Sequence, residues 1–277
     1  MNCSDPASPA APDALLPAPL QAVIVLGRGG YGGAVPAELA RLCERLRELL
    51  APGHVALAWV DRASPSLPEA LDECLSAVPQ AGHILVQPVF APTDTALLRW
   101  LEKLAQRWRH RQAQPVELPR VVFAPALAEL PQLAELLARQ LGQVPALPDV
   151  SQTQPEHWQH DPRAWSEVPQ FQQHLLFCMG PRCTALGAAG LWSHLRARLR
   201  AHPQLKRTVM PLHTSCQYPC NLGPLMISYP EGLWWGRLDA AAIDAVVDAG
   251  LAPEGAARTH LVHRHGAGGP QQPQAGV

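Results

Sequence analysis

The sequence predicts an α/β protein with two domains, and three features carry this prediction. Its 277 residues suffice for about two domains of ordinary size. Strand and helix patterns alternate from residue 21 to residue 141, which is typical of a parallel sheet covered by helices. The patterns resume near residue 173, where four of the seven cysteines lie between Cys178 and Cys220.

In the first half, short apolar runs alternate with segments whose apolar residues recur at helical spacing. We expect strands at residues 22–27, 54–60, 83–90 and 121–123. We expect helices at residues 35–50, 67–77, 95–111 and 130–141. Ligands of such sheets bind at the carboxyl ends of the strands. The glycine-rich turn from Gly27 to Gly33 lies at one such end, but it does not fit the dinucleotide fingerprint, so we interpret it as a flexible turn.

The second half has its own order of elements. We expect strands at residues 173–177, 207–212, 225–229 and 233–236, and helices at residues 185–201 and 240–249. Asp239 is the expected N-cap of the last helix. The order βαβ followed by ββα matches a thioredoxin-like fold.

Composition divides the chain into five parts. They are a disordered leader (1–20), a first domain (21–142), a Pro- and Gln-rich linker (143–170), a second domain (171–252) and a flexible tail (253–277). The leader lacks the basic and apolar regions of a signal peptide, and no apolar run approaches the roughly 20 residues that cross a bilayer. We therefore expect a cytoplasmic protein. A net charge of −1 and a pI near 6.9 do not favour nucleic acid as a partner.

The four clustered cysteines form two pairs that suit one metal centre. Cys178 and Cys183 make a C-x4-C, Cys216 and Cys220 make a C-x3-C, and 32 residues separate the pairs. Four thiolates suit an iron–sulfur cluster or zinc, although structural zinc sites more often use C-x2-C. A disulfide would require an oxidising compartment. We favour an iron–sulfur cluster, with zinc, free thiols or disulfides as alternatives; four cysteines fit [2Fe–2S] and [4Fe–4S] equally well.

Three segments of the first domain carry a family resemblance. They are Val23-Ile-Val-Leu-Gly-Arg-Gly-Gly, Ser64-Pro-Ser-Leu-Pro-Glu-Ala-Leu and Ile84-Leu-Val-Gln-Pro-Val-Phe. Together they resemble the class II chelatases, the CbiX-type sirohydrochlorin cobaltochelatases that insert a metal into a tetrapyrrole. The resemblance implies a flavodoxin-like parallel fold, and it makes pairing into a homodimer one option because small family members pair in this way.

The sequence departs from that family where metal is bound. Arg28 stands where the family has a metal-binding His, and Ala91-Pro-Thr-Asp-Thr-Ala replaces a segment with a second His. An arginine carries only donors and cannot bind a cation, but it would hold a carboxylate of a tetrapyrrole. Asp94 is either an oxygen ligand or the N-cap of the helix that follows. Arg28 and Asp94 are therefore candidate tetrapyrrole-pocket residues of a non-catalytic domain.

A second resemblance covers residues 171–251. Cys216-x-x-x-Cys220 is followed by Gly223-Pro224, Tyr229-Pro-Glu-Gly and Trp234-Trp-Gly. This pattern is similar to that of the thioredoxin-like [2Fe–2S] ferredoxins. The resemblance implies that Cys178 and Cys183 bind one iron and that Cys216 and Cys220 bind the other. With four thiolates present, we expect no ligand role for His213.

We therefore expect an iron–sulfur electron carrier, a [2Fe–2S] ferredoxin domain tethered to a chelatase-like domain and linked to cobalamin or sirohaem metabolism. The expected partners are a redox protein and a tetrapyrrole. The alternative is a sirohydrochlorin chelatase with altered metal ligands and a structural or regulatory cluster. We favour electron transfer over chelatase (lyase) activity because both family histidines are replaced.

Overall fold

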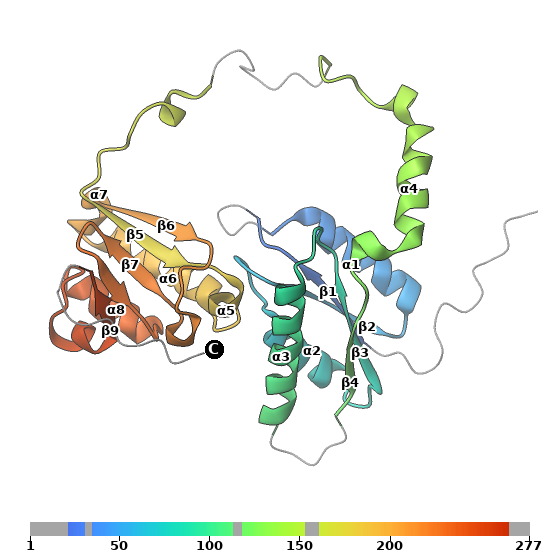
Figure 1. Cartoon of the computed structure of the whole chain (residues 1–277), viewed down its shortest axis with the longest axis horizontal. Coiled ribbons are helices and arrows are strands. Elements are labelled where there is room, and N and C mark those ends of the chain that lie inside the picture. The colour runs from blue at the N-terminus through green and yellow to red at the C-terminus, as the bar shows by residue number, and fades with distance from the viewer. Residues whose placement is uncertain (1–21, 31–34, 113–117, 153–160, 266–277) are drawn as a thin grey trace, which may run out of the picture. The chain divides into compact units, whose positions relative to one another are not determined.

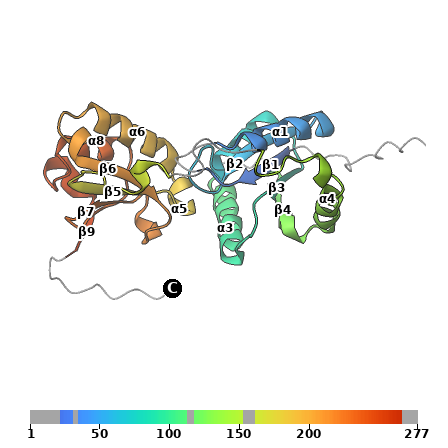
Figure 2. The same ribbon diagram turned by 90° about the horizontal axis from the view of Figure 1, so that it is seen from above.

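The computed structural model describes residues 22–30, 35–112, 118–152 and 161–265. They form two compact units, each organised around its own sheet (Figures 1 and 2). Of the described residues, the first unit contains 22–27, 36–58, 67–112 and 118–128, and the second contains 28–30, 35, 59–66, 129–152 and 161–265. The strands of the first sheet are blue to green in Figure 1, and those of the second are yellow to red. The predicted leader at residues 1–20 lies outside the described residues.

The first sheet confirms the predicted parallel fold. Its strands are β1 (Ala22–Gly27), β2 (His54–Trp59), β3 (His83–Pro88) and β4 (Arg120–Phe123), in the order β2-β1-β3-β4. β1 pairs with β3, and β3 with β4, in parallel. All six residues of β1 are buried, as expected for the apolar central strand of a sheet.

Four α-helices belong to this half of the chain. They are α1 (Ala37–Leu50), α2 (Leu67–Ala77), α3 (Thr95–Arg111) and α4 (Pro131–Leu141). α1 buries Cys43 against Val25 and Val55. α3 is held by Trp108, whose Nε1 donates a hydrogen bond of 2.7 Å to Asp72 Oδ1 on α2. The amphipathic patterns of these segments therefore predicted their positions within two residues.

The second sheet has five strands. They are β5 (Gln173–Cys178), β6 (Val209–Thr214), β7 (Met226–Tyr229), β8 (Leu233–Trp235) and β9 (Leu261–Arg264), in the order β6-β5-β7-β8-β9. β5 and β6 are parallel, and the remaining neighbours are antiparallel. A parallel pair followed by a hairpin confirms the thioredoxin-like order.

The helices of the second unit are α5 (Pro181–Thr184), α6 (Ala188–Ala201), α7 (Leu205–Thr208) and α8 (Ala240–Asp248). One helix was predicted from residue 185, but the structure has a break there. Gly187 has a left-handed φ of +88°, which a glycine adopts without strain, and α6 begins after it. The break leaves α5 as a separate turn that carries Cys183.

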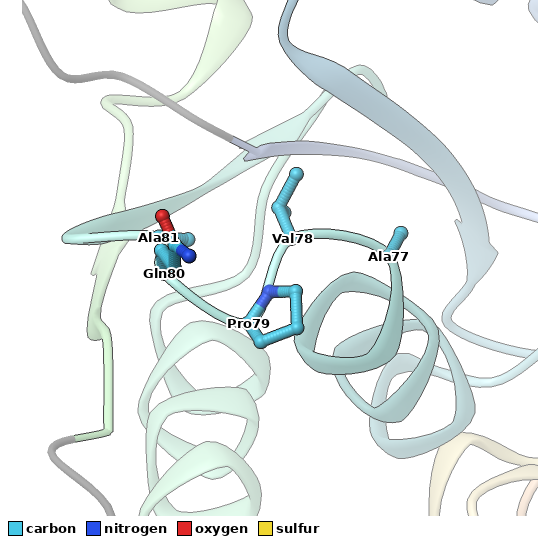
Figure 3. Close-up of a pocket in the computed structure, with 5 residues that line it drawn as sticks. All are labelled: Ala77, Val78, Pro79, Gln80 and Ala81. Carbon is cyan, nitrogen blue, oxygen red and sulfur yellow. The ribbon is translucent and has the colours of Figure 1, made fainter.

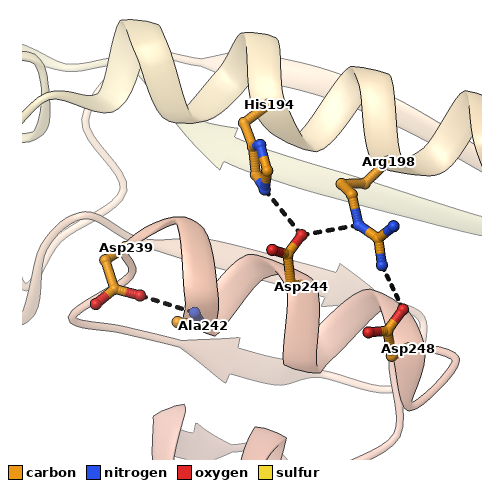
Figure 4. A network of polar contacts seen from close by, with 6 residues as sticks. All are labelled: His194, Arg198, Asp239, Ala242, Asp244 and Asp248. Carbon is orange, nitrogen blue, oxygen red and sulfur yellow. Dashed lines mark hydrogen bonds and ion pairs between the residues drawn. The ribbon is translucent and has the colours of Figure 1, made fainter.

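Polar contacts join α6 to α8 (Figure 4). Nε2 of His194 and Nε of Arg198 each lie 2.8 Å from Oδ1 of Asp244, and Arg198 also pairs with Asp248. Because these side chains are between a third and two thirds exposed, we expect the network to fix helix register more than to add stability. Asp239 accepts a hydrogen bond of 2.7 Å from the Ala242 N–H, which confirms the predicted N-cap.

The described residues also contain five short 3-10 helices. They are η2 (Leu127–Glu129), η3 (Val144–Ala146), η4 (Arg163–Trp165), η5 (Cys220–Leu222) and η6 (Gly255–His260). In the predicted linker, residues 143–152 and 161–170 are all exposed. The prediction of a flexible tail from residue 253 was wrong for residues 255–264, where η6 and β9 form. Edge pairing of β9 with β8 orders this segment despite its polar composition.

Candidate metal centre

The fold brings both cysteine pairs to one end of the second sheet. Cys178 is the last residue of β5 and pairs in register with Thr214, the last residue of β6. Because β5 and β6 are parallel, the loops that follow them leave the same edge of the sheet. One loop carries Cys183 on α5, and the other carries Cys216 and Cys220.

Backbone and side-chain hydrogen bonds fix the two loops against each other. The Met179 N–H donates to the Thr214 carbonyl over 2.9 Å. Nε2 of Gln217 donates to the Leu176 carbonyl over 3.0 Å and to Oγ1 of Thr214 over 2.7 Å. These bonds tie the start of the Cys216 loop to the strands that precede both cysteine pairs.

The four thiols converge between these loops. Sγ of Cys216 lies 3.3 Å from Sγ of Cys220. The thiol of Cys178 donates a hydrogen bond of 3.6 Å to the Ser215 carbonyl and is close enough to the thiols of Cys183 and Cys216 to interact with both. Cys178 and Cys183 are each 1% exposed, Cys220 is half-buried and Cys216 is exposed. The group therefore has a buried pair on the protein side and a pair near the surface.

A glycine keeps space open beside the buried pair. A methyl group on Gly223 would lie 2.9 Å from Sγ of Cys183 and 3.2 Å from the Cys220 carbonyl oxygen. Such distances are shorter than ordinary contacts, so no larger residue fits without displacing the sulfur. Gly223 therefore keeps clear the space beside one sulfur that a cluster would use.

Mutual hydrogen bonding separates the proton affinities of the thiols. The hydrogen bond with Cys183 lowers the pKa of Cys178 to about 6, although burial acts in the opposite direction. The hydrogen bond with Cys178 and burial raise the pKa of Cys183. Burial raises the pKa of Cys216 to about 11. One negative charge is thus readily accommodated on Cys178, and a bound cation would be needed to hold four thiolates together.

The four thiols are a donor set that an iron–sulfur cluster can use. Among the described residues, no group of three or more His, Cys, Asp or Glu side chains is arranged around one ion position. A [2Fe–2S] cluster takes four thiolates in total, and two close pairs provide them. The number and type of these donors are therefore compatible with such a cluster.

His213 lies near this site, on β6. Its ring contacts Trp192 edge to face, with centroids 5.7 Å apart. Burial lowers the pKa of His213. That His213 is not a cluster ligand stays a prediction.

In the first half of the chain, Arg28 has an acidic partner that sequence reasoning missed. A guanidinium nitrogen of Arg28 lies 3.0 Å from Oδ2 of Asp61, and Asp61 is only 4% exposed. The Gly29 N–H also donates to the Asp61 carbonyl over 3.1 Å. Asp61 follows the second strand, so its place at a carboxyl strand end was the signal available in the sequence.

Asp94 serves as a helix cap. Its Oδ1 accepts a hydrogen bond of 2.8 Å from the Ala96 N–H at the start of α3. The described contacts thus place Arg28 with Asp61 and Asp94 with Ala96.

A separate pocket of about 330 Å³ at the end of α2, shown in Figure 3, is lined by Ala77, Val78, Pro79, Gln80 and Ala81. With Gln80 as its one polar side chain, this lining offers no metal ligand or titratable group.

Comparisons with known proteins divide the chain in the same way. The family model described as CbiX matches residues 22–144. The first unit is similar to CbiX. A solved cobalamin (vitamin B12) biosynthesis CbiX protein of Marinobacter aquaeolei VT8 aligns with 46% of this chain and 98% of its own, at 16% identity and a TM-score of 0.34. We refer to the unit built on β1–β4 as the CbiX-like unit.

The second unit is similar to 2Fe-2S ferredoxins. The ferredoxin of Aquifex aeolicus (strain VF5) is 25% identical over 84 residues, which are 27% of this chain and 76% of that protein. A ferredoxin of Clostridium pasteurianum is 36% identical over 44 residues, 16% of this chain and less than half (43%) of that protein. A structure of the Aquifex aeolicus thioredoxin-like [2Fe-2S] ferredoxin covers 35% of this chain and 94% of its own, at 21% identity and a TM-score of 0.32. We refer to the unit built on β5–β9 as the ferredoxin-like unit.

The resemblance found in the sequence is therefore confirmed for both units. The assignment of folds rests on the strand orders given above, because the structural similarity scores are low. None of the helices in the described ranges combines the length and apolarity needed to cross a membrane.

Proposed function

We propose that this chain is an electron carrier whose ferredoxin-like unit holds a [2Fe–2S] cluster through Cys178, Cys183, Cys216 and Cys220. The observation that carries the proposal is the convergence of four thiols from two loops at one end of the sheet. Similarity to 2Fe-2S ferredoxins supports the same cofactor. When bound, the cluster supplies one-electron transfer.

The protein residues then hold the cluster and set its surroundings. Cys178 and Cys183 form the buried side, and Cys216 and Cys220 form the side nearer to solvent. Because Cys216 is exposed, its side of the cluster is the expected point of electron exchange with a redox protein. Solvent access and hydrogen bonds to sulfur also tune the redox potential there. A surface position of this kind suits short-lived docking rather than a deep substrate pocket.

For the CbiX-like unit we propose tetrapyrrole binding without chelatase turnover. The guanidinium of Arg28 cannot bind a cation and is paired with Asp61, while Asp94 is used as a helix cap. The match of the CbiX family model to residues 22–144 supports a link to cobalamin or sirohaem metabolism. Electrons from the cluster would serve that pathway.

A metal chelatase with altered ligands is the second candidate, favoured by the match of the CbiX model to residues 22–144. Cobalt insertion into sirohydrochlorin, followed by absorbance, separates the two functions. Cobalt insertion by wild type that is lost in Asp94→Ser, which keeps a capping oxygen, and retained in a Cys216→Ser variant would support the chelatase. Absence of insertion by wild-type protein would support the carrier.

The carrier is tested by iron and acid-labile sulfide analysis of protein purified without oxygen, together with its visible spectrum. We expect about two irons and two sulfides per chain, with bands that dithionite bleaches. Cys216→Ser should lose this chromophore. The matched control, Cys43→Ser, replaces a buried thiol on α1 and should retain it. A colourless wild-type protein that contains zinc or no metal would refute the proposal.

A further inference from the structure

A second set of candidate metal ligands lies at the end of the edge strand β9 of the ferredoxin-like unit, with His263 in the strand and His265 just after it. A pocket of about 350 Å³ is lined by Pro219, Leu222, Trp234, Val262, His263 and His265. The two histidines are exposed, and the lining includes no acidic residue. These imidazoles are separate from the four cysteines and have no part in the proposed cluster.

Strand geometry brings the two imidazoles together. His263 and His265 are two positions apart along an extended chain, so their side chains lie on the same face. His263 pairs across the strands with Trp234 of β8, and the His265 N–H donates to the Gly232 carbonyl over 2.9 Å. The backbone is therefore held on both sides of Arg264, whose side chain takes the opposite face.

The imidazole separation matches that of two ligands on one ion. The ring centroids of His263 and His265 are 5.0 Å apart. A metal bound at about 2.1 Å to one nitrogen of each ring would lie about 3.2 Å from each ring centre, so one ion can reach both rings, whose planes are 86° apart. Both rings therefore already lie at a separation that two adjacent ligands of one ion can have.

The surroundings suit further ligands that are not protein groups. The Trp234 ring lies 5.6 Å from His265 and 6.3 Å from His263, between centroids, and shields one side of the pair. Within the described residues, the buried Nε1 of Trp234 has no hydrogen-bond partner. The pocket provides room for water molecules bound to an ion.

We propose that His263 and His265 form a binding site for a hydrated divalent transition-metal ion of the kind that imidazole prefers, such as Ni²⁺, Co²⁺ or Zn²⁺. Water fills the remaining positions. A metal already held in a planar tetrapyrrole does not suit two rings this close, because its open positions lie on opposite sides of the ring. Two adjacent imidazoles require two adjacent open positions, which a hydrated ion has.

The test uses full-length protein without a histidine tag, with its iron and sulfide content measured first. Ni²⁺ binding is followed by calorimetry and by metal analysis after dialysis. We expect His263→Ala and His265→Ala each to weaken binding about tenfold or more, because even loss of an outer-sphere partner of a metal costs that much. The double variant should bind one equivalent fewer than wild type.

Arg264→Gln is the matched control, because it changes the residue between the two histidines on the opposite face of β9. It should leave Ni²⁺ affinity within about threefold, a change of under 1 kcal/mol. Equal numbers of Ni²⁺ equivalents in wild type and the double variant would refute the site. Thiol-bound nickel would persist in the double variant, and iron content reports the cluster separately, so failure of one proposal does not imply failure of the other.

Discussion

A methyl group added to Gly180 would lie 2.9 Å from both Cα and Cβ of Cys216. The loop after β5 thus passes directly against the backbone of the loop after β6. Only a residue without a side chain permits this approach. The two loops, and with them the two cysteine pairs, therefore lie this close only because residue 180 is a glycine.

We predict that Gly180→Ala reduces cluster loading and destabilises the ferredoxin-like unit by about 1–3 kcal/mol, because the added methyl group overpacks the contact with Cys216. Iron analysis and urea unfolding measure the two effects. Gly190→Ala is the control, since a methyl group there meets no atom within 4 Å. Full iron content in Gly180→Ala would show that the loops separate without cost.

The ion pair between Arg28 and Asp61 predicts a rescue experiment. Arg28→Ala should destabilise the chain by about 1–2 kcal/mol, because it leaves a buried carboxylate without its guanidinium while the arginine itself is half exposed. Adding Asp61→Asn removes the buried charge and should restore part of the loss. Urea unfolding of both variants measures this coupling; equal stabilities of the single and double variants would contradict it.

Two substitutions of Asp94 separate its role as a helix cap from a role as a ligand. Asp94→Ala should cost about 1 kcal/mol of stability, because the Ala96 N–H loses its acceptor. Asp94→Ser keeps a capping oxygen and should retain nearly wild-type stability in thermal unfolding. If Asp94→Ser instead lost tetrapyrrole binding with stability unchanged, the carboxylate would have a role beyond the cap.

The two thiols of the CbiX-like unit should be chemically inert. Burial raises the pKa of Cys74 to about 12 and also raises that of Cys43. At pH 8 both stay protonated, so iodoacetamide should modify them only after unfolding in urea, as read by peptide mass spectrometry. Modification of Cys74 at the same rate with and without urea would contradict its burial.

The raised pKa of Cys74 also predicts how the stability of the fold changes at alkaline pH. The folded pKa of Cys74 lies above its ordinary value of 9.0, so the protonated thiol favours the folded state. This contribution is complete below about pH 9 and is lost between about pH 9 and pH 12. Cys74→Ala should therefore flatten the fall of unfolding free energy over that range, and an unchanged slope would contradict the assignment.

Local patterns predicted most elements because their causes are local. The helix at 95–111 and the strand at 22–27 were predicted with the bounds that the structure has, since apolar periodicity and capping act within a few residues. Where one residue changes the local geometry, as at Gly187, the predicted helix start was three residues early.

The sequence by itself determined the two α/β units and the four cysteines, because alternation and spacing are properties of neighbouring residues. The tertiary structure decided that Asp61 pairs with Arg28, that Gly180 lies against Cys216, and that residues 261–264 form an edge strand. These contacts join positions that are tens of residues apart. Their existence depends on which strands become neighbours, and burial and pairing set that order only when the whole unit folds.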